Sequence, residues 1–308
     1  MRGNVTPIVI PETVHRAALE ELGGYFTKIS RLSPELMAAD HLDPGKAAIA
    51  ARQLEQFVSL RGKKVLEIGS GFGVNLAEWI RHFDIDGYGV EPSSLGFDAS
   101  FRASQILFTA NGLDKARIID ATGEALPFDD RSFDIVYSAN VLEHVGNPEK
   151  VLEEAMRVVK PGGFLHMEFP NYTSYYESHY SVLQPPVTSK KWLARWVRLF
   201  GRSSDFVETL NLLNPVWCRR AVRQLSAKYP LTLLSLGEET FLAKLARPYE
   251  FRTMISANRM SSVLRVLQAV NLGNWLGHTI VALQGHYPIL LTIRREAAPL
   301  SAGAKGSA

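Results

Sequence analysis

Three glycines at alternate positions, Gly69, Gly71 and Gly73, follow a run of apolar residues in this chain. Because glycine has no Cβ, its backbone adopts positive φ without strain and can lie against a ligand. A helix is expected directly after the turn, over residues 74–82, and its free N–H groups would face the same point. A dinucleotide-binding turn would have its third glycine at Val74, and the chain has no phosphate loop of the form G-x-x-x-x-G-K-[ST]. The spacing therefore predicts a site for a nucleotide-like ligand without a pyrophosphate.

A candidate residue for binding the sugar of such a ligand is Glu91. Glu91 ends the short apolar run 87–90 and lies 22 residues beyond Gly69. At that place in an α/β sheet, an acidic side chain can accept hydrogen bonds from both hydroxyls of a ribose. Glu91 is therefore predicted to bind the sugar of the ligand.

The elements that must position these residues alternate along the middle of the chain. Beyond the two apolar runs already named, extended segments are expected to begin at residues 118, 132 and 164, with helical stretches between them. This alternation predicts a parallel sheet with right-handed crossover connections. Ligand sites in such sheets form outside the carboxyl ends of the strands.

Five linked motifs make the chain similar to the class I S-adenosylmethionine-dependent methyltransferases, in the branch called methyltransferase type 11. The motifs are E-I-G-x-G-x-G at 67–73, G-E-A-L-P-F at 123–128, S-F-D-x-V at 132–136, L-E-H-V at 142–145 and R-V-x-K-P-G-G at 157–163. The resemblance implies an α/β fold, with a Rossmann-like, doubly wound, seven-stranded, mostly parallel sheet, a helical N-terminal segment and helical cap insertions. It also implies S-adenosylmethionine as the cofactor. Segments 231–236 and 289–294 are expected to be the last two strands.

The resemblance also implies which residues contact the cofactor. The three glycines would lie against its methionine part and ribose, and Glu91 would bind the ribose. Glu67 would orient the amino group, and Asn140 and Val141 would close over the methionine end.

The adenine end departs from the family pattern. Thr122 and Gly123 stand where the family has Asp-Gly or Asp-Ala, so a hydroxyl replaces a carboxylate that would accept from the adenine amino group. That contact is expected to be weaker or to pass to Asp120 or Glu124.

Three residues are predicted to be catalytic, and His144 is the first of them. It lies just past the expected strand that begins at residue 132, where a base for an oxygen acceptor is needed; the alternative is a local hydrogen-bonding role. Glu177 and His179 are the second choice. They belong to residues 170–180, which contain four tyrosines and either contact the acceptor or form an ordinary surface loop.

A metal ion is not expected. The ubiquinone-pathway O-methyltransferases, which the motif around Glu143 and His144 resembles, have the pattern E-x-x-E-H at a divalent-cation site. This chain has Asn140 in place of the first glutamate. One carboxylate fewer makes the site less suitable for a hard cation.

A basic amphipathic helix is expected over residues 190–202, with Trp192 and Trp196 on its apolar face. Such a helix either covers the protein's own active site, which is the favoured interpretation, or lies in a membrane interface. The apolar segment 262–287 is interrupted by polar residues and is not expected to span a bilayer.

Composition narrows the class of protein. The 308 residues are 46% hydrophobic and 21% charged, which is typical of a folded globular chain, and a net charge of +3 gives no argument for nucleic acid. The single cysteine, Cys218, excludes an internal disulfide and is expected to be a packed apolar residue. The absence of a signal-like segment predicts a cytoplasmic protein, with peripheral contact to the inner face of the membrane as an alternative.

Four segments are expected: an N-terminal helical segment (1–60), the cofactor-binding core (61–170), the remaining strands with two cap insertions (171–296) and a frayed tail (297–308). Helices are predicted at 34–39 and 44–60. Tyr25 and Phe26 would either cover the adenosine or pack in the core.

Together these features predict an S-adenosylmethionine-dependent O-methyltransferase that acts on a small glycan-type, lipid-linked or amphipathic acceptor, of the kind associated with surface polysaccharides. Two alternatives stay open. One is a quinone or other prenyl lipid as the acceptor, and the other is a noncatalytic ligand-binding protein on the same fold.

Overall fold

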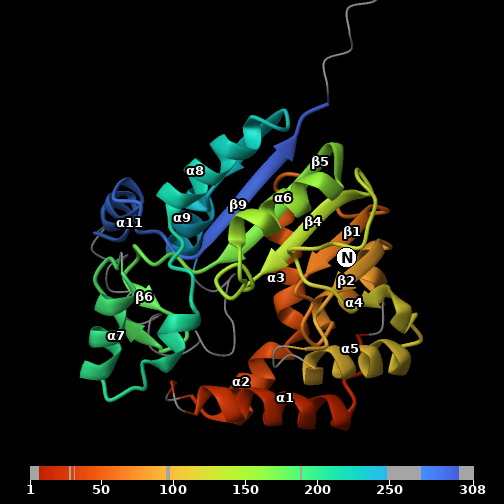
Figure 1. Cartoon of the computed structure of the whole chain (residues 1–308), viewed down its shortest axis with the longest axis horizontal. Helices are drawn as coiled ribbons and strands as arrows, with labels where there is room; N and C mark the ends of the chain where they lie inside the picture. The colour runs from red at the N-terminus through yellow and green to blue at the C-terminus, as the bar shows by residue number, and fades with distance from the viewer. Residues whose placement is uncertain are drawn as a thin grey trace, which may run out of the picture.

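The computed structural model describes residues 7–27, 29–30, 32–94, 98–187, 189–247 and 272–297. Within them, seven strands form one sheet in the order β3-β2-β1-β4-β5-β9-β8 (Figure 1). The strands are β1 (Lys64–Ile68), β2 (Asp86–Val90), β3 (Ile118–Ile119), β4 (Phe133–Ala139), β5 (Val159–Phe169), β8 (Leu231–Ser235) and β9 (Ile289–Arg295).

Most of this sheet is parallel. β1 pairs in parallel with β2 and β4, and the parallel pairing continues to β3 on one side and to β5 on the other. β9 then inserts antiparallel between β5 and β8. The predicted Rossmann-like sheet is thus confirmed, including the places of its last two strands.

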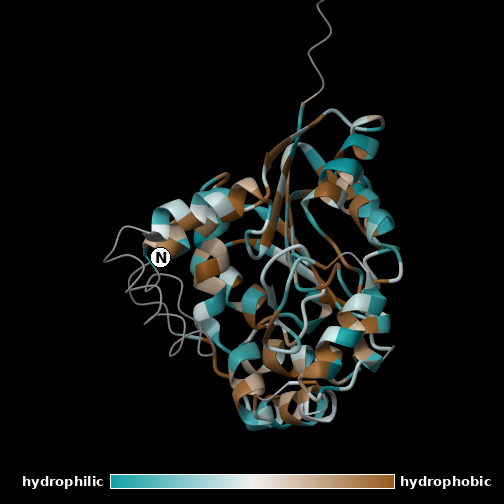
Figure 2. Ribbon diagram, turned by 90° about the vertical axis from the view of Figure 1, so that its left-hand side faces the viewer, coloured by the Kyte–Doolittle hydropathy of each residue, from teal (hydrophilic) through white to brown (hydrophobic). Residues whose placement is uncertain are grey.

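Helices cover both faces of the sheet. They are α1 (Glu12–Phe26), α2 (Pro34–His41), α3 (Pro44–Leu54), α4 (Val74–Phe83), α5 (Asp98–Ala110), α6 (Pro148–Val158), α7 (Lys190–Leu199), α8 (Pro215–Ser226), α9 (Glu238–Ala246) and α11 (Leu272–Ala282), with short 3-10 helices η1 (Lys115–Arg117) and η2 (Asp205–Thr209). In Figure 2 the strands are mainly hydrophobic, and the helices around them carry hydrophilic residues on their outer sides. None of the described helices is long and apolar enough to cross a membrane.

Three expected elements are shorter than predicted, among them α7, which ends at Leu199 instead of residue 202. Helix α3 begins as expected, with the Asp43 side chain accepting the N–H of Gly45, but it ends at Leu54 instead of residue 60. The N–H groups of Phe57 and Val58 both turn back to the carbonyl of Leu54, which ends the helix ahead of β1. The strand expected from residue 118 has only two residues, because it is an edge strand that pairs only with Gly89 and Val90.

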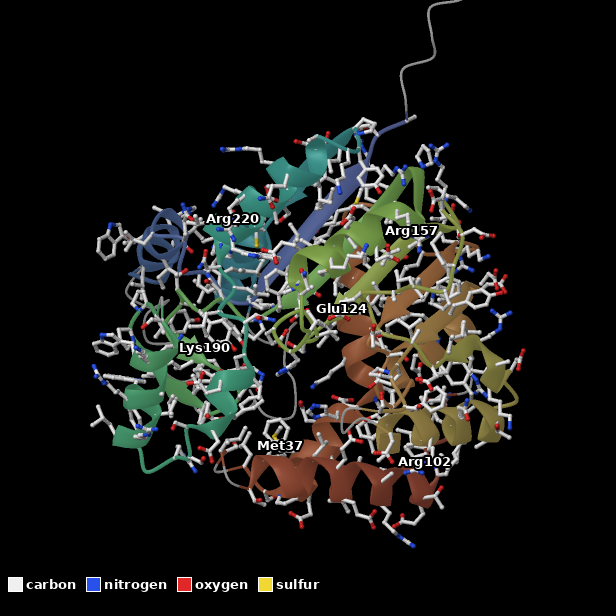
Figure 3. All side chains as sticks on the ribbon, in the orientation of Figure 1. Met37, Arg102, Glu124, Arg157, Lys190 and Arg220 are labelled. Atoms are coloured by element: carbon white, nitrogen blue, oxygen red, sulfur yellow. The ribbon has the colours of Figure 1, made fainter. Side chains whose placement is uncertain are left out.

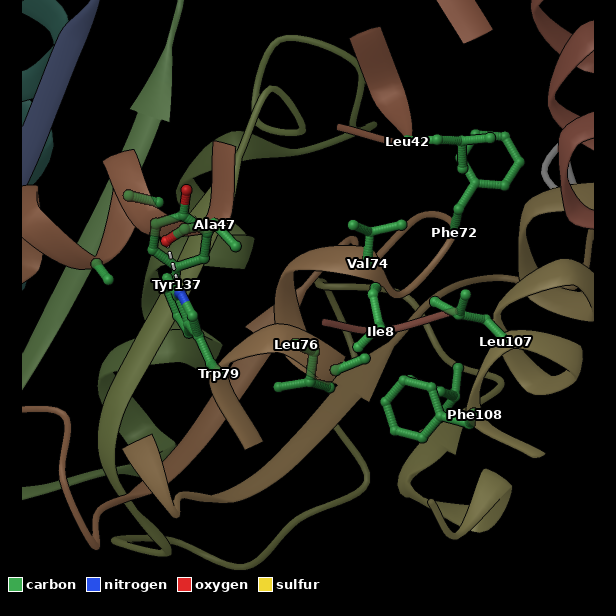
Figure 4. Close-up of a cluster of buried hydrophobic side chains, with 14 of the residues drawn as sticks. Ile8, Leu42, Ala47, Phe72, Val74, Leu76, Trp79, Leu107, Phe108 and Tyr137 are labelled. Atoms are coloured by element: carbon green, nitrogen blue, oxygen red, sulfur yellow. Dashed lines mark hydrogen bonds between the residues drawn. The ribbon is translucent and has the colours of Figure 1, made fainter. Parts of the chain in front are cut away.

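The N-terminal helices pack against α4, α5 and the glycine turn. Trp79 of α4 lies edge-on to Tyr137 of β4 and donates a 2.8 Å hydrogen bond from Nε1 to the carbonyl of Ala47 in α3 (Figure 4). Leu42, which follows α2, lies beside Phe72 of the glycine turn in the same buried cluster (Figure 4). The segment therefore covers one side of that turn.

The segment between β5 and β8, where a cap insertion was expected, divides into two parts. A small hairpin, β6 (Tyr176–Glu177) with β7 (Val182–Leu183), precedes α7 and η2 on the side toward which β4 and β5 run (Figure 1). In contrast, α8 buries its apolar face, including Cys218, against β5 and β9 and is part of the main core. Of the second predicted insertion, residues 248–271 lie outside the described residues, as do residues 298–308 of the predicted tail.

Candidate active site

The predicted cofactor residues meet at the carboxyl edge of the sheet. The glycine turn follows β1, Glu91 follows β2, and Gly123 lies in the loop after β3. Asn140 and Val141 follow β4 directly. Parallel strands bring these loops to one edge, which is where ligands bind in open α/β sheets.

The glycine turn requires its glycines for two different reasons. All three have positive φ, at 70°, 52° and 77° for Gly69, Gly71 and Gly73. A Cβ on Gly69 would lie 2.2 Å from Cγ2 of Val141, so a side chain there would collide with the loop after β4. A Cβ on Gly71 would have no atom within 4 Å, so the backbone there faces open space that a ligand can approach.

Two buried carboxylates flank this turn. Glu91 accepts the N–H of Gly71 at 2.8 Å through Oε2, and Glu67 accepts from Nδ2 of Asn75 at 2.9 Å through Oε1. Oε2 of Glu67 is buried and has no hydrogen-bond partner among the described residues. Burial raises the pKa of Glu67 to about 8 and that of Glu91 to about 7, and the charge of Glu21 in α1 adds to the rise at Glu91.

S-adenosylmethionine, the cofactor implied by the sequence, has hydrogen-bond donors that suit these two carboxylates. A buried carboxylate oxygen without a partner is costly, and an ammonium group or a hydroxyl would supply the missing hydrogen bond. The amino group and the ribose of S-adenosylmethionine offer those two groups. Asn75, which holds Glu67, was not predicted, although its place in the first turn of the helix after the glycines was a usable signal.

At the predicted adenine end, Asp120 and Glu124 were expected to take over the adenine contact, and both already accept hydrogen bonds from the protein. Asp120 accepts the N–H of Ser93 at 2.8 Å and also the Ser93 hydroxyl. Glu124, in the central loop region of Figure 3, accepts the N–H of Gly146 at 2.9 Å. Thr122 is half-buried and Gly123 is buried between Ile68 and Val151. Asp120 and Glu124 thus fasten neighbouring loops, and any adenine contact would come in addition.

The three predicted catalytic residues form one cluster with Glu143. Nδ1 of His179 lies 2.7 Å from Oε1 of Glu177, and its Nε2 lies 3.3 Å from Nε2 of His144. Glu177 also accepts the N–H of Tyr180 at 2.6 Å. Glu143 is fully buried with its Oε1 3.7 Å from Nε2 of His144. The first and second choices for a base are therefore neighbours in space.

Burial and charge give these groups different pKa values. Burial, together with the positive charge of His179, lowers the pKa of His144 to about 3, and burial raises that of Glu143 to about 7. Burial alone would lower the pKa of His179, but the negative charges of Glu177 and Glu143 and the Glu177 hydrogen bond outweigh it, so the pKa is raised. A proton in this cluster is held more firmly on His179 than on His144.

Residues that the sequence did not single out hold the cluster in place. Asn211 donates its backbone N–H to the carbonyl of Glu143 at 2.7 Å and its Nδ2 to the carbonyl of Val145 at 2.8 Å. The ring of Phe206 packs 5.7 Å from that of His144 and 5.1 Å from that of His179. Both residues come from the region between α7 and α8, more than sixty positions after His144, and no local pattern marks them.

The tyrosine-rich segment is largely interior. Tyr172 and Tyr180 are buried in a cluster with Phe206, so the two act as packing residues behind the histidines and not as exposed acceptor contacts. Phe26 is partly buried between that cluster and the buried cluster that contains Phe72 and Trp79, in line with its expected packing role. The side chain of Tyr25 lies outside the described residues.

Helix α7 lies against the same cluster. Leu193, Ala194 and Val197 are buried in it, whereas Trp192 and Leu199 are exposed at 53% and 77%. One part of the predicted apolar face thus backs the histidine cluster and another part faces solvent.

Comparisons with known proteins identify the core. A family described as "Methyltransferase domain" matches residues 66–167. The sarcosine/dimethylglycine N-methyltransferase of Aphanothece halophytica is 35% identical over 102 residues, 33% of this chain and 36% of that protein. An uncharacterised methyltransferase of Mycobacterium tuberculosis is 32% identical over 140 residues, 46% of this chain and 52% of that protein. The chain thus spans between about a third and about half of the length of these curated relatives.

A solved structure extends the likeness in fold to nearly the whole chain. The crystal structure of the [4+2]-cyclase SpnF covers 95% of this chain and 100% of its own, with a TM-score of 0.50 and 15% identity. At that identity only the fold is shared, and a fold carries many chemistries. The family match covers the segment with the glycine turn, Glu67, Glu91 and His144. Residues 66–167 accordingly match a methyltransferase domain, which makes this part of the chain similar to the S-adenosylmethionine-dependent methyltransferases.

Proposed function

We propose that the chain transfers a methyl group from S-adenosylmethionine to an oxygen of a small acceptor, of a glycan-type or amphipathic kind. The observation that supports this best is the contact of His144 with the Glu177–His179 pair, just beyond the loop that closes on the glycine turn. A hydroxyl acceptor must lose a proton during methyl transfer, and a chain of imidazoles ending in a carboxylate can receive it.

The cofactor supplies an activated methyl group on its sulfonium, so the protein's share is binding, alignment and water exclusion. Glu91 would accept from the ribose hydroxyls and Glu67 from the amino group. Asn140 and Val141 would close over the methionine end. Asn140 has a φ of 55° and donates its N–H to the carbonyl of Glu168 at 2.8 Å, so this closing loop is fixed by β5.

The cluster geometry favours a particular proton path. If Glu177 accepts the Nδ1 proton of His179, Nε2 of His179 has a free lone pair and accepts the Nε2 proton of His144. Nδ1 of His144 is then the base that takes the acceptor's proton. His144 is a weak base by itself because its pKa is lowered to about 3. Passing its Nε2 proton to His179, whose pKa is raised, would offset that weakness.

A second candidate is methylation of a small amine. Its support is the Aphanothece halophytica relative, a sarcosine/dimethylglycine N-methyltransferase whose 102 matching residues cover 33% of this chain. A neutral amine attacks the methyl group through its lone pair, so its methylation would depend less on proton transfer to the histidines. Dependence on His144 therefore separates the two acceptor classes.

The test begins with calorimetry of S-adenosylmethionine and its demethylated product, S-adenosylhomocysteine. Release of the latter is then followed with three kinds of acceptor: hydroxylated glycans, sarcosine-like amines, and quinols with a prenyl chain. We expect binding of both cofactor forms and turnover with a hydroxyl acceptor that falls sharply in His144→Ala. Binding without turnover on any acceptor would favour a noncatalytic protein on this fold. Turnover confined to amines would overturn the oxygen assignment.

A further inference from the structure

The proton path described above leaves Glu143 without a role, and its surroundings are unusual. The side chain is fully buried, and neither carboxylate oxygen has a hydrogen-bond partner among the described residues. Leaving such a group buried is costly unless it is neutralised, paired or bound to a metal. The groups nearest to it include the imidazoles of His144 and His179, whose Nε2 atoms lie 3.3 Å apart.

We propose that Glu143, His144 and His179 bind a divalent first-row transition-metal ion, with Zn²⁺ as the reference case. One ligand atom from each of the three residues lies within 4.8 Å of the other two. Two imidazole nitrogens at the usual bond lengths of about 2.0 to 2.1 Å around a tetrahedral ion would be about 3.3 Å apart. The two Nε2 atoms are 3.3 Å apart, and Oε1 of Glu143 is 3.7 Å from Nε2 of His144.

The outer contacts of the cluster support the same assignment. Nδ1 of His179 is held by Glu177 at 2.7 Å, and Glu177 is itself fixed by the N–H of Tyr180. A histidine ligand that donates its second ring nitrogen to a carboxylate is a recurring feature of metal sites, because it fixes the tautomer and strengthens the ligand. Here that hydrogen bond leaves the lone pair of Nε2 available to bind an ion.

The donor set also selects the kind of ion. Mg²⁺ and Ca²⁺ prefer oxygen ligands, whereas two imidazoles with one carboxylate suit Zn²⁺ or Fe²⁺. The prediction from the sequence was that no metal binds, because Asn140 replaces a carboxylate. That argument concerned hard cations and did not include His179, which reaches the site from the β6–β7 hairpin.

Three protein ligands leave a coordination position for a further group. The side chain of His144 is 25% exposed while Glu143 and His179 are buried, so the open position faces the His144 side. This step rests on the proposed function: an acceptor hydroxyl would bind there and lose its proton more readily, because a bound dication lowers the pKa of an oxygen ligand. The ion would then replace the proton shared by the two histidines.

Tag-free protein, stripped of metal by a chelator, is titrated with Zn²⁺ by calorimetry and with Co²⁺ by visible absorption. We expect one site, and X-ray absorption of the wild-type Zn²⁺ form should show two imidazole ligands with oxygen completing the shell. Glu177→Gln should weaken Zn²⁺ binding by about 10- to 100-fold, as for an outer-contact residue, and His179→Ala should weaken it further. His278→Ala, at an exposed histidine of α11, is the control and should leave affinity unchanged.

Two results would contradict the metal site. No Zn²⁺ binding beyond that of His179→Ala, or a wild-type absorption spectrum without imidazole ligands, would overturn the proposal and leave the cluster as a hydrogen-bonded proton path. The spectrum needs no variant, so a folding failure of His179→Ala does not affect it. Cofactor binding is measured separately by calorimetry with S-adenosylhomocysteine, so failure of the metal site and failure of the methyltransferase assignment give different results.

Discussion

The Nε2 atoms of His144 and His179 lie 3.3 Å apart although 35 residues separate the two histidines in the chain. β4 ends just before His144, and the β6–β7 hairpin that follows β5 carries His179 back to it. In the proposed mechanism, acceptor activation depends on these two loops, which approach each other at the carboxyl edge of the sheet. We assign the histidine pair to the acceptor side of the proposed site and the glycine turn to the cofactor side.

Gly71→Val is expected to weaken S-adenosylmethionine binding by about 2 kcal/mol or more, roughly 30-fold, while the domain stays folded. The backbone at Gly71 faces open space at a φ of 52°, where a β-branched residue is strained and would crowd a ligand. Gly62→Val is the matched control, since Gly62 has a φ of 67° with equally open surroundings and lies just ahead of β1, at its other end. Equal losses of affinity in the two variants, measured by calorimetry, would refute the assignment of Gly71 to the cofactor site.

Cofactor affinity is expected to increase as the pH rises through about 7 and then about 8, the pKa values to which burial raises Glu91 and Glu67. The sign follows because hydrogen bonds from ribose hydroxyls and from an ammonium group favour the ionised carboxylates. In Glu91→Gln the increase in cofactor affinity near pH 7 should disappear, and the binding free energy at high pH should be weaker by about 1 to 3 kcal/mol. Calorimetry at several pH values tests this, and an affinity that is independent of pH would show that neither carboxylate binds the cofactor.

Glu177→Gln is expected to lower turnover and to shift its pH profile toward acid. The negative charge of Glu177 raises the pKa of His179, and the proton path needs His179 to be able to accept a proton. Turnover of the metal-free wild type should therefore rise with pH as His179 loses its proton, and loss of the charge should move that rise to lower pH. A profile that keeps its position in the variant would remove His179 from the path.

Helix α7 is expected to act as a cover for the site and not as a membrane anchor. Wild-type protein should then stay in solution when mixed with anionic vesicles at low salt, and Arg195→Glu should leave turnover unchanged because Arg195 is exposed. Each basic residue near an anionic surface contributes about 1 kcal/mol to binding. Sedimentation of the wild type that is lost in Arg195→Glu and Lys191→Glu would instead assign the exposed Trp192 and its neighbours to a membrane surface.

Local patterns were enough to predict the sheet and to bring the proposed cofactor residues to one edge of it. Each strand is a short apolar run, and Gly71, Glu91 and Val141 follow such runs directly, so the parallel sheet brings them together although they are far apart in the sequence. The same argument found His144, because it follows β4. The length of α3 could not be read in this way, since its end depends on a turn that returns to the carbonyl of Leu54.

The acceptor side depends on contacts between distant segments. His179 and Glu177 were predicted from residue type and from their place after the fifth strand, and no pattern placed them directly against His144. Asn211 and Phe206, which hold and cover the cluster, have no local signature. Tyr172 and Tyr180 were expected at the mouth of the site and are buried, because apolar burial decided their place over the polarity of their hydroxyls.

The most direct test of methyl transfer uses S-adenosylmethionine with a deuterated methyl group, added with purified protein to metabolite extracts of cells that lack the protein. The expected result is a product that gains the labelled methyl group on an oxygen, with wild-type protein and not with His144→Ala. His278→Ala should behave as the wild type. If the protein binds S-adenosylmethionine tightly but no metabolite acquires the label, or if the label appears equally with His144→Ala, the proposed methyl transfer through the histidine cluster is wrong.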